Sequence, residues 1–305
     1  MAFDTHAADP HWGSLIIAYF FLGGIAAGAY AMAALASLFG DETDRRLTKP
    51  AHYLAFPLVS ICGVLLIVDL SYPERFWHML IASETYRPIV KWWSPMSVGS
   101  WGLSLFGFFS FCSFVGALAD ADFRPLRWAK PWADRMRHGV VGRAIEVAGA
   151  ASAFFLGAYT GTLLSATNQP VWASTDWISA LFLASSASTG IAAILLFHRF
   201  FSKLDDEAGL QRLEWLDRWA IVLEALMLVC FVGSIARIDW RAFTIWPGAL
   251  LPGFVVPCGM ILPVLLARGH HRKTSWIGPF LVLAAGLALR YAIVAMPPKF
   301  LVTHS

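Results

Sequence analysis

Long apolar runs alternate with short polar segments along the whole chain. A helix that crosses the hydrocarbon core of a bilayer needs about 20 consecutive, mostly apolar residues. Eight runs meet this requirement, at residues 13–39, 51–70, 96–118, 141–165, 174–198, 217–236, 246–267 and 275–296. The pattern therefore predicts an all-α polytopic membrane protein with eight transmembrane helices.

The spans, and not the chain length, set the domain organisation. We expect a single integral membrane domain, in which residues 1–140 hold the first three spans and a cytoplasmic loop, and residues 141–305 hold spans four to eight. The longest loop, 119–140, has room for a short surface helix. No basic stretch and no small-residue cleavage site precede the first apolar run, so this run is predicted to be a first span and not a cleaved signal peptide.

Composition supports the membrane assignment. Charged residues make up 14% of the sequence and hydrophobic residues 58%, whereas soluble domains carry about 25% charged residues. No basic run interleaved with aromatic residues is present, which argues against a nucleic-acid partner. The four cysteines lie far apart inside apolar runs without a C-x-x-C pair, so they are interpreted as small buried side chains and not as metal ligands.

The distribution of Lys and Arg predicts the orientation of the protein. Loops 40–50, 119–143, 199–218 and 268–274 together hold 16 of these residues, and the remaining non-spanning segments hold 6. Loops rich in Lys and Arg stay on the cytoplasmic side. We therefore expect a multi-pass protein of the bacterial inner (cytoplasmic) membrane with both termini in the periplasm.

Small residues gather in the first and fifth runs. Gly24 and Gly28 have G-x-x-x-G spacing, and residues 185–190 of the fifth run are mostly Ser, Thr, Ala and Gly. Small residues at such spacing let helix backbones approach closely. The two stretches also align loosely, and a duplicated four-helix unit would place spans one and five in the same direction.

Polar residues inside the runs lie at similar depths. At about 1.5 Å per residue, Tyr19, Asp69, Tyr159, Thr160 and Arg290 all fall within about 10 Å of the predicted outer surface. The cytoplasmic halves of the spans are nearly free of polar groups away from their ends. This asymmetry predicts one polar cavity that opens outward.

Glu224 stands apart, about 18 Å from the outer end of its span and near the midplane. An unpaired carboxylate at that depth takes up a proton or finds a partner. Two interpretations stay open: a residue on a proton path, or a neutral acid hydrogen-bonded between helices. Histidines lie only at span ends or in loops, His52 and His198 among them, so no haem, iron–sulfur or metal site is expected in this protein.

Several motifs together resemble the NrfD / polysulfide reductase membrane-subunit family. They span nearly the whole sequence: HWGSLIIAYFFLGGIAAGAY at 11–30, DLSYPERFWHML at 69–80, SPMSVGSWGLSLFG at 94–107, YTGTLLSATNQPVW at 159–172, LASSASTGIA at 183–192 and LRYAIVA at 289–295. The resemblance implies two four-helix bundles and a quinone site near the outer face. It also implies a partner iron–sulfur protein with four clusters, joined to a molybdopterin catalytic subunit.

The resemblance assigns roles to individual residues. The tyrosine of the YTG motif, Tyr159, is expected at the quinone pocket, and Asp69 and Arg75 match the family aspartate and the arginine that follows it. Tyr19 stands where some members carry a quinone-side histidine, so proton transfer at that position differs here.

The function predicted from these residues is a quinone-exchanging membrane anchor. Menaquinone or ubiquinone would be bound near Tyr19, Asp69, Tyr159, Thr160 and Arg290. Asp69, oriented by Arg75, would exchange protons with the outer water. Two alternatives remain: an ion-coupled secondary transporter that uses Glu224 and Arg290, and a structural anchor without quinone chemistry.

Overall fold

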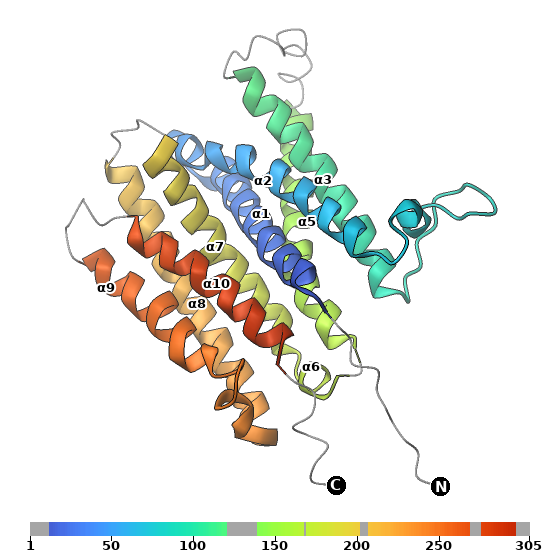
Figure 1. Cartoon of the computed structure of the whole chain (residues 1–305). Helices are drawn as coiled ribbons and strands as arrows, with labels where there is room; N and C mark the ends of the chain where they lie inside the picture. The colour runs from blue at the N-terminus through green and yellow to red at the C-terminus, as the bar shows by residue number, and fades with distance from the viewer. Residues whose placement is uncertain (1–11, 121–138, 168, 202–206, 269–275, 297–305) are drawn as a thin grey trace, which may run out of the picture.

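A computed structural model describes residues 12–120, 139–167, 169–201, 207–268 and 276–296, which form a bundle of long helices (Figure 1). Within these residues, seven helices are long and apolar enough to cross a membrane. They are α1 (Ser14–Phe39), α2 (Glu42–Asp69), α3 (Pro95–Asp120), α5 (Gly139–Ser165), α7 (Trp177–Phe201), α8 (Glu207–Asp239) and α10 (Ile277–Val294). The all-helical, multi-span class is confirmed. Both termini and most of loop 119–140 lie outside the described residues.

The seventh apolar run differs from the predicted α-helical span. It forms a π-helical segment, η4 (Leu251–Ile261), that continues into the short helix α9 (Leu262–Arg268). Pro257 lies inside η4, where it cannot donate the backbone hydrogen bond that an α-helix requires. A local change to π geometry is one way in which apolar helices accommodate proline. The apolar part of this segment, Leu251–Leu266, is shorter than the seven long helices, so the structure shows seven of the eight predicted spans.

Two helices begin well before their apolar runs. α2 starts at Glu42, because the Asp41 and Asp44 side chains form a capping box at its N-terminus. α8 starts at Glu207, ten residues before the predicted span. Arg212 on this extension lies 2.9 Å from Asp44, so the two polar helix extensions are linked to each other. Hydrophobicity alone could not predict these turns, because they carry the polar residues that surround a span.

Helices α1 and α7 form the centre of the bundle. α1 packs against α2, α5 and α7, whereas α7 packs against α1, α5, α8 and α10. α3 lies against α2 and α5, and α10 lies against η4 and α9. α1 and α7 are accordingly among the most buried of the long helices.

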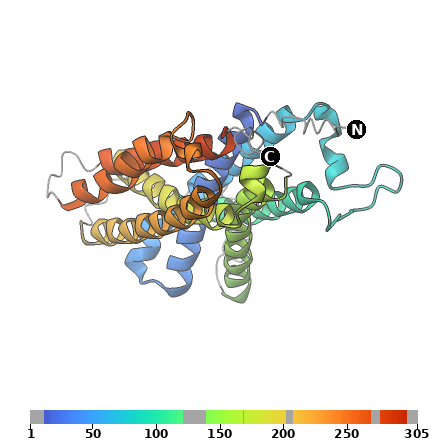
Figure 2. The same cartoon turned by 90° about the horizontal axis from the view of Figure 1, so that it is seen from below.

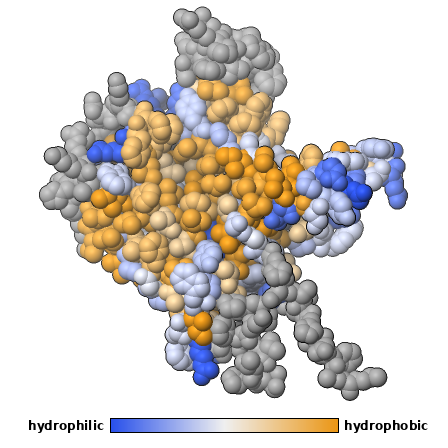
Figure 3. Space-filling view, in the orientation of Figure 1, coloured by the Kyte–Doolittle hydropathy of each residue, from blue (hydrophilic) through white to orange (hydrophobic). Residues whose placement is uncertain are grey.

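The short helices mark one end of the bundle, which we call the α6 end. There α1 begins and α10 ends, and α6 (Pro170–Ala173) and η3 (Trp240–Phe243) connect the long helices (Figures 1 and 2). At the same end η1 (Pro73–Met79) and the segment that follows project sideways from the bundle. Apolar side chains cover the flank of the bundle, and hydrophilic ones lie mostly toward its ends and on this projection (Figure 3).

Backbone contact between α1 and α7 explains the small residues of both helices. A Cβ atom on Gly28 would overlap the backbone carbonyl oxygen of Ser186, and one on Gly190 would overlap the backbone of Gly28 and Ala29. Each glycine therefore makes room for the backbone of the other helix. This confirms the close helix packing that the glycine spacing predicted.

Replacing Gly28 or Gly190 by Ala should lower the thermal midpoint of unfolding of the purified protein in detergent. Overpacking of this kind costs about 1–3 kcal/mol or more, because backbone atoms have no free rotamer that would relieve the overlap. Gly233→Ala in α8 is the matched control, since a Cβ there meets nothing within 4 Å. Equal midpoints for all three variants would contradict the proposed packing.

Candidate functional site

Tyr159 of α5 joins two of the sequence motifs at the α6 end. Its side chain is 7% exposed, and its hydroxyl donates a 2.6 Å hydrogen bond to the carbonyl oxygen of Pro95, the first residue of α3. The phenol lies over Gly99, where any Cβ atom would overlap the ring. The YTG motif and the SPMSVG motif therefore form one contact, in which Gly99 provides the space and Pro95 fixes the hydroxyl.

Tyr19 of α1 lies close to Tyr159. Its side chain is 2% exposed, and the two phenols are near enough to interact electrostatically. The Cys62 thiol of α2 donates to the Tyr19 backbone carbonyl at 3.7 Å. Among the described residues, nothing forms a hydrogen bond with the Tyr19 hydroxyl. A tyrosine hydroxyl in a largely enclosed side chain usually has such a partner, so this one is a candidate for contact with a ligand.

Asp69 and Arg75 lie at the rim of this region. Asp69 is the last residue of α2, and both side chains are exposed. The Arg75 guanidinium lies 5.2 Å from the centre of the Tyr72 ring, and no ion pair joins Arg75 to Asp69 in the part of the protein that the structure describes. Asp69 follows Cys62 by seven residues, or about 10 Å along the helix. It is thus two turns from the Tyr19 backbone.

Arg290 of α10 is completely buried and forms hydrogen bonds with three helices. Nε donates to the Phe20 carbonyl of α1 at 3.0 Å, and Nη1 donates to the Gly286 carbonyl of its own helix at 3.0 Å. On α7, Ser185 Oγ accepts from Nη1 at 3.0 Å and Ser186 Oγ accepts from Nη2 at 3.3 Å. The guanidinium therefore holds α1, α7 and α10 together. Arg290 was predicted to lie at the quinone pocket, whereas the N–H groups of its guanidinium form hydrogen bonds with protein atoms.

The glycine stripe of α1 also makes space for this guanidinium. A Cβ atom on Gly24 would overlap Nη2 of Arg290 and lie 2.9 Å from the Ser186 hydroxyl oxygen. Gly24 and Gly28, one turn apart, thus serve different purposes: the first admits a charged side chain and the second a helix backbone.

Thr160, which was also predicted to contact quinone, is 1% exposed and forms a hydrogen bond within its own helix. Its hydroxyl donates to the Gly157 carbonyl at 3.2 Å. The next residue, Gly161, packs against the α7 backbone. This part of α5 therefore forms the seam with α7 and not a surface that faces Tyr19.

Glu224 of α8 belongs to the same network as Arg290. Its side chain is 5% exposed, and its carboxylate accepts a 2.5 Å hydrogen bond from the Ser188 hydroxyl of α7. The same Ser188 hydroxyl lies 3.1 Å from the Ser185 carbonyl oxygen, and the Ser185 hydroxyl accepts from Arg290. Ser185 therefore lies between the acid and the guanidinium. Sequence reasoning noted the α7 serines only as small residues, although their three-residue spacing places Ser185 and Ser188 on one face.

The half of the bundle away from the α6 end also contains buried polar side chains. There the Tyr30 and Ser113 hydroxyls lie 2.9 Å apart, the Ser37 hydroxyl donates to Glu146 at 2.7 Å, and Asp217 is 7% exposed. Ser37 and Asp217 lie at the ends of their predicted spans, where polar residues were expected, whereas Tyr30 and Ser113 lie further inside. Both pairs join different helices, and such mutual pairing is what a hydrocarbon environment requires of buried polar groups.

No group of three His, Cys, Asp or Glu residues that could hold a metal ion occurs among the described residues. The site consists instead of hydrogen-bonding side chains. Two phenols lie near the α6 end, one carboxylate lies at the rim, and a separate guanidinium–serine–carboxylate network lies deeper between α7, α8 and α10. Of the two phenols, Tyr159 already donates its hydroxyl proton to Pro95, so Tyr19 is the one that can donate a hydrogen bond to a ligand.

Comparison with known proteins identifies the family. A family model described as "Polysulphide reductase, NrfD" matches residues 4–300. The sequence is 31% identical to a polysulfide reductase component of Wolinella succinogenes, covering 93% of this protein and 92% of that one, and 26% identical to protein NrfD of Escherichia coli over the same shares. A segment covering 31% of this protein and 20% of the relative is 30% identical to a selenate reductase subunit of Mesobacillus selenatarsenatis. The protein therefore belongs to the NrfD family of multi-pass membrane proteins.

Proposed function

We propose that this protein is the quinone- or quinol-binding membrane subunit of a respiratory reductase complex. The relatives named as components of polysulfide reductase and of selenate reductase support a role as one subunit of such a complex. In the proposal, the partner is a four-cluster iron–sulfur protein on the periplasmic side, joined to a molybdopterin catalytic subunit. That partner supplies the electron path, and this protein supplies the quinone site.

The observation that carries the proposal is the Tyr19 side chain, which is 2% exposed and lies near Tyr159. Tyr159 already donates its proton to Pro95, which fixes its ring, whereas the Tyr19 hydroxyl has no such partner among the described residues. A quinone carbonyl accepts hydrogen bonds, and a phenol in an apolar setting is a suitable donor. Menaquinone or ubiquinone would be bound with one carbonyl toward Tyr19, between α1, α3 and α5.

Asp69 suits proton exchange at the mouth of this site. Conversion between quinone and quinol transfers two protons with two electrons. Asp69 is exposed at the end of α2, so it can exchange protons with bulk water, and it is about 10 Å along α2 from the residue that contacts Tyr19. Arg75, which lies over Tyr72, adds positive charge to the same rim. Thr160 and Arg290 contribute by fixing the helices that form the wall.

Glu224 is proposed as a residue on a proton path, and the network gives it an alternative role. A guanidinium stays charged in proteins, and a buried charge needs compensation. Glu224 reaches Arg290 through Ser185, which makes it the counter-charge for Arg290. The two roles differ in the charge of the carboxylate: a counter-ion is permanently ionised, whereas a proton carrier alternates.

The complete topology is part of the proposal. Counting η4 and α9 as one span gives eight spans in two four-helix bundles, α1–α2–α3–α5 and α7–α8–η4/α9–α10, whose members pack as neighbours. The protein would lie in the bacterial inner membrane, with the α6 end and both termini on the periplasmic side.

Two other functions make different predictions. An ion-coupled transporter built around Glu224 and Arg290 would give solute uptake in liposomes that contain this protein alone. A structural anchor would neither retain quinone during purification nor lose activity with quinone analogues. Quinone that co-purifies with the complex, together with inhibition by such analogues, would support the proposed function over both.

Replacing Asp69 by Asn should reduce quinone-linked turnover of the complex by about tenfold or more, because the carboxylate no longer exchanges protons at the site. Co-purification of the partner subunits should be unchanged. Asp176→Asn is the control, since Asp176 is also exposed at the α6 end. Normal turnover in the Asp69 variant would remove this residue from the mechanism.

Replacing Tyr19 by Phe should weaken binding of a quinone analogue by roughly tenfold, the effect of losing one hydrogen bond of about 1–1.5 kcal/mol. The thermal midpoint should stay the same, because the hydroxyl contributes no hydrogen bond among the described residues. Binding is measured by titration of the purified protein, with Tyr86→Phe, a change at a 76% exposed side chain, as control. Equal affinities of the Tyr19→Phe variant and the unchanged protein for the analogue would show that the Tyr19 hydroxyl does not contact quinone.

The role of Glu224 is tested by the variants Glu224→Gln and Arg290→Met and by their combination. If Glu224 is the permanent counter-ion, each single change should lower the free energy of unfolding by about 3–5 kcal/mol, because it leaves the other charge buried without a partner. The double change should cost less than the sum of the two, because it removes both charges together. Denaturant unfolding in detergent measures the free energy of unfolding of the two single variants and of the double variant. Additive costs, with Glu224→Gln close to wild type, would show that Glu224 is not a permanent counter-ion.

A further inference from the structure

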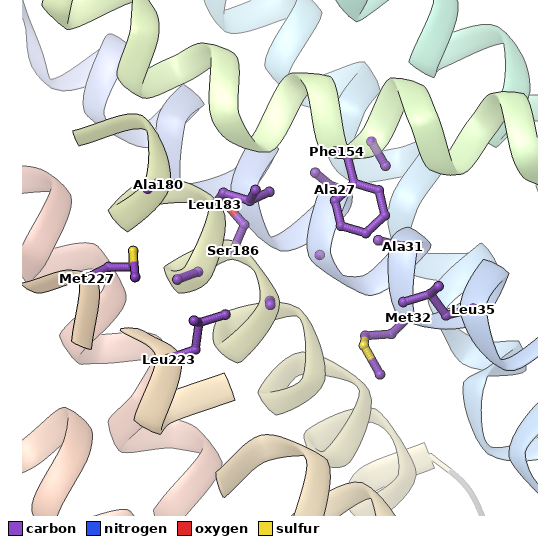
Figure 4. Close-up of a pocket in the computed structure, with 14 residues that line it drawn as sticks. Ala27, Ala31, Met32, Leu35, Phe154, Ala180, Leu183, Ser186, Leu223 and Met227 are labelled. Carbon is purple, nitrogen blue, oxygen red and sulfur yellow. The ribbon is translucent and has the colours of Figure 1, made fainter. Parts of the chain in front are cut away.

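An apolar groove of about 290 Å³ lies between α1, α5, α7 and α8, and neither Tyr19 nor Tyr159 lines it (Figure 4). The residues that line it come from all four helices: Ala27, Gly28, Ala31, Met32 and Leu35 of α1, Ala153 and Phe154 of α5, Ala180, Leu183, Ala184, Ser186 and Ala187 of α7, and Leu223 and Met227 of α8. Most are small, so the stripe that lets α1 and α7 approach also leaves this hollow beside their contact.

The groove is long and narrow. α1 and α7 touch where Gly28 meets Ser186. From this point the lining continues to Ala180 on α7 and to Leu35 on α1, which is about 9 Å along one helix and about 10 Å along the other. The labelled side chains in Figure 4 lie spread along this path around an open centre. An extended molecule fits this shape better than a compact ring.

The chemistry of the lining excludes a polar occupant. None of the lining residues is charged, and the one hydroxyl, on Ser186, already donates to the Phe182 carbonyl at 2.7 Å and accepts from Arg290 at 3.3 Å. A water molecule in a cavity needs two to four polar partners, and an apolar cavity stays dry. A quinone ring would likewise leave its carbonyls without donors.

The size and position of the groove point to hydrocarbon from the bilayer. The neighbouring side chains Leu35, Phe154 and Leu223 are 37%, 42% and 47% exposed, so the groove opens on the flank that faces lipid. An α-helix of a partner is about 10–12 Å wide, which is too large for this volume. The groove holds roughly ten close-packed methylene groups, about one stretch of a single lipid tail.

We propose that this groove binds one acyl tail of a membrane phospholipid, which fills the seam between α1 and α5 on one side and α7 and α8 on the other. The tail covers Ser186 and thereby keeps the hydrogen bonds of Arg290 away from water. This inference does not depend on the proposed quinone chemistry, because the groove and the tyrosine pair share no residue.

The test uses the full-length protein in bilayers of phosphatidylcholine that carries a diazirine in the middle of one acyl tail. After exchange into unlabelled lipid and irradiation, mass spectrometry locates the adducts. We expect retained adducts on Met32, Leu183 and Met227, and about tenfold fewer on Leu105, a 48% exposed residue of α3, since an exchangeable surface lipid is lost during the exchange.

Two variants show whether the groove itself retains the lipid. Ala187→Leu should lower the adducts on Met32 and Leu183 by about tenfold, because the larger side chain fills the groove. Ala180→Leu repeats the test at its other end, should the first variant fold poorly. Ala151→Leu, an exposed change on α5 outside the groove, is the matched control and should change nothing.

Three results would overturn the proposal. Adducts could be equal on Met32 and Leu105 after the exchange. They could persist unchanged in the folded Ala187→Leu and Ala180→Leu variants. They could also appear in the groove only with a diazirine-labelled isoprenoid quinone and not with the phospholipid. Any of these outcomes would show that no phospholipid tail resides there.

Discussion

The Arg290 guanidinium is the interaction on which the arrangement of the central helices depends. Within a bilayer no water can satisfy a charged group, so the protein must supply all its partners. Arg290 obtains them from the Phe20 carbonyl of α1, two serines of α7 and its own helix, and Glu224 of α8 is bound to the same stretch of α7 through Ser188. Four helices are thereby fixed relative to one another, and Gly24 is the position that allows it.

The candidate site follows from this arrangement. Phe20, whose carbonyl binds Arg290, is the neighbour of Tyr19, so the same contact that holds α1 also fixes the height of the Tyr19 phenol. Tyr159 is fixed independently by Pro95 and Gly99 of α3. The result is one phenol with a satisfied hydroxyl beside one without a partner among the described residues. In an apolar setting, such a pair is suited to receive a ligand that carries hydrogen-bond acceptors.

Sequence reasoning predicted what depends on local pattern and missed what depends on which helices are neighbours. The apolar runs predicted seven of the spans, and the glycine spacing predicted close helix packing without naming the partner of Gly28. Depth along a helix grouped Tyr19 with Tyr159, but it also grouped Arg290 with them and separated it from Glu224. Depth says nothing about the direction in which a side chain points, and only the packing of α7 between α8 and α10 brings that acid and base together. The early start of α2 and the π geometry around Pro257 were missed because capping and proline accommodation do not change hydrophobicity.

Quinone entry between α1, α3 and α5 beside Tyr19 is testable by photolabelling of the purified protein with an azido-quinone, followed by mass spectrometry. We expect adducts on residues around Tyr19 and Tyr159 that disappear with excess unlabelled quinone. Adducts confined to the lipid-facing groove near Met32 and Met227, or labelling that excess quinone does not reduce, would contradict it.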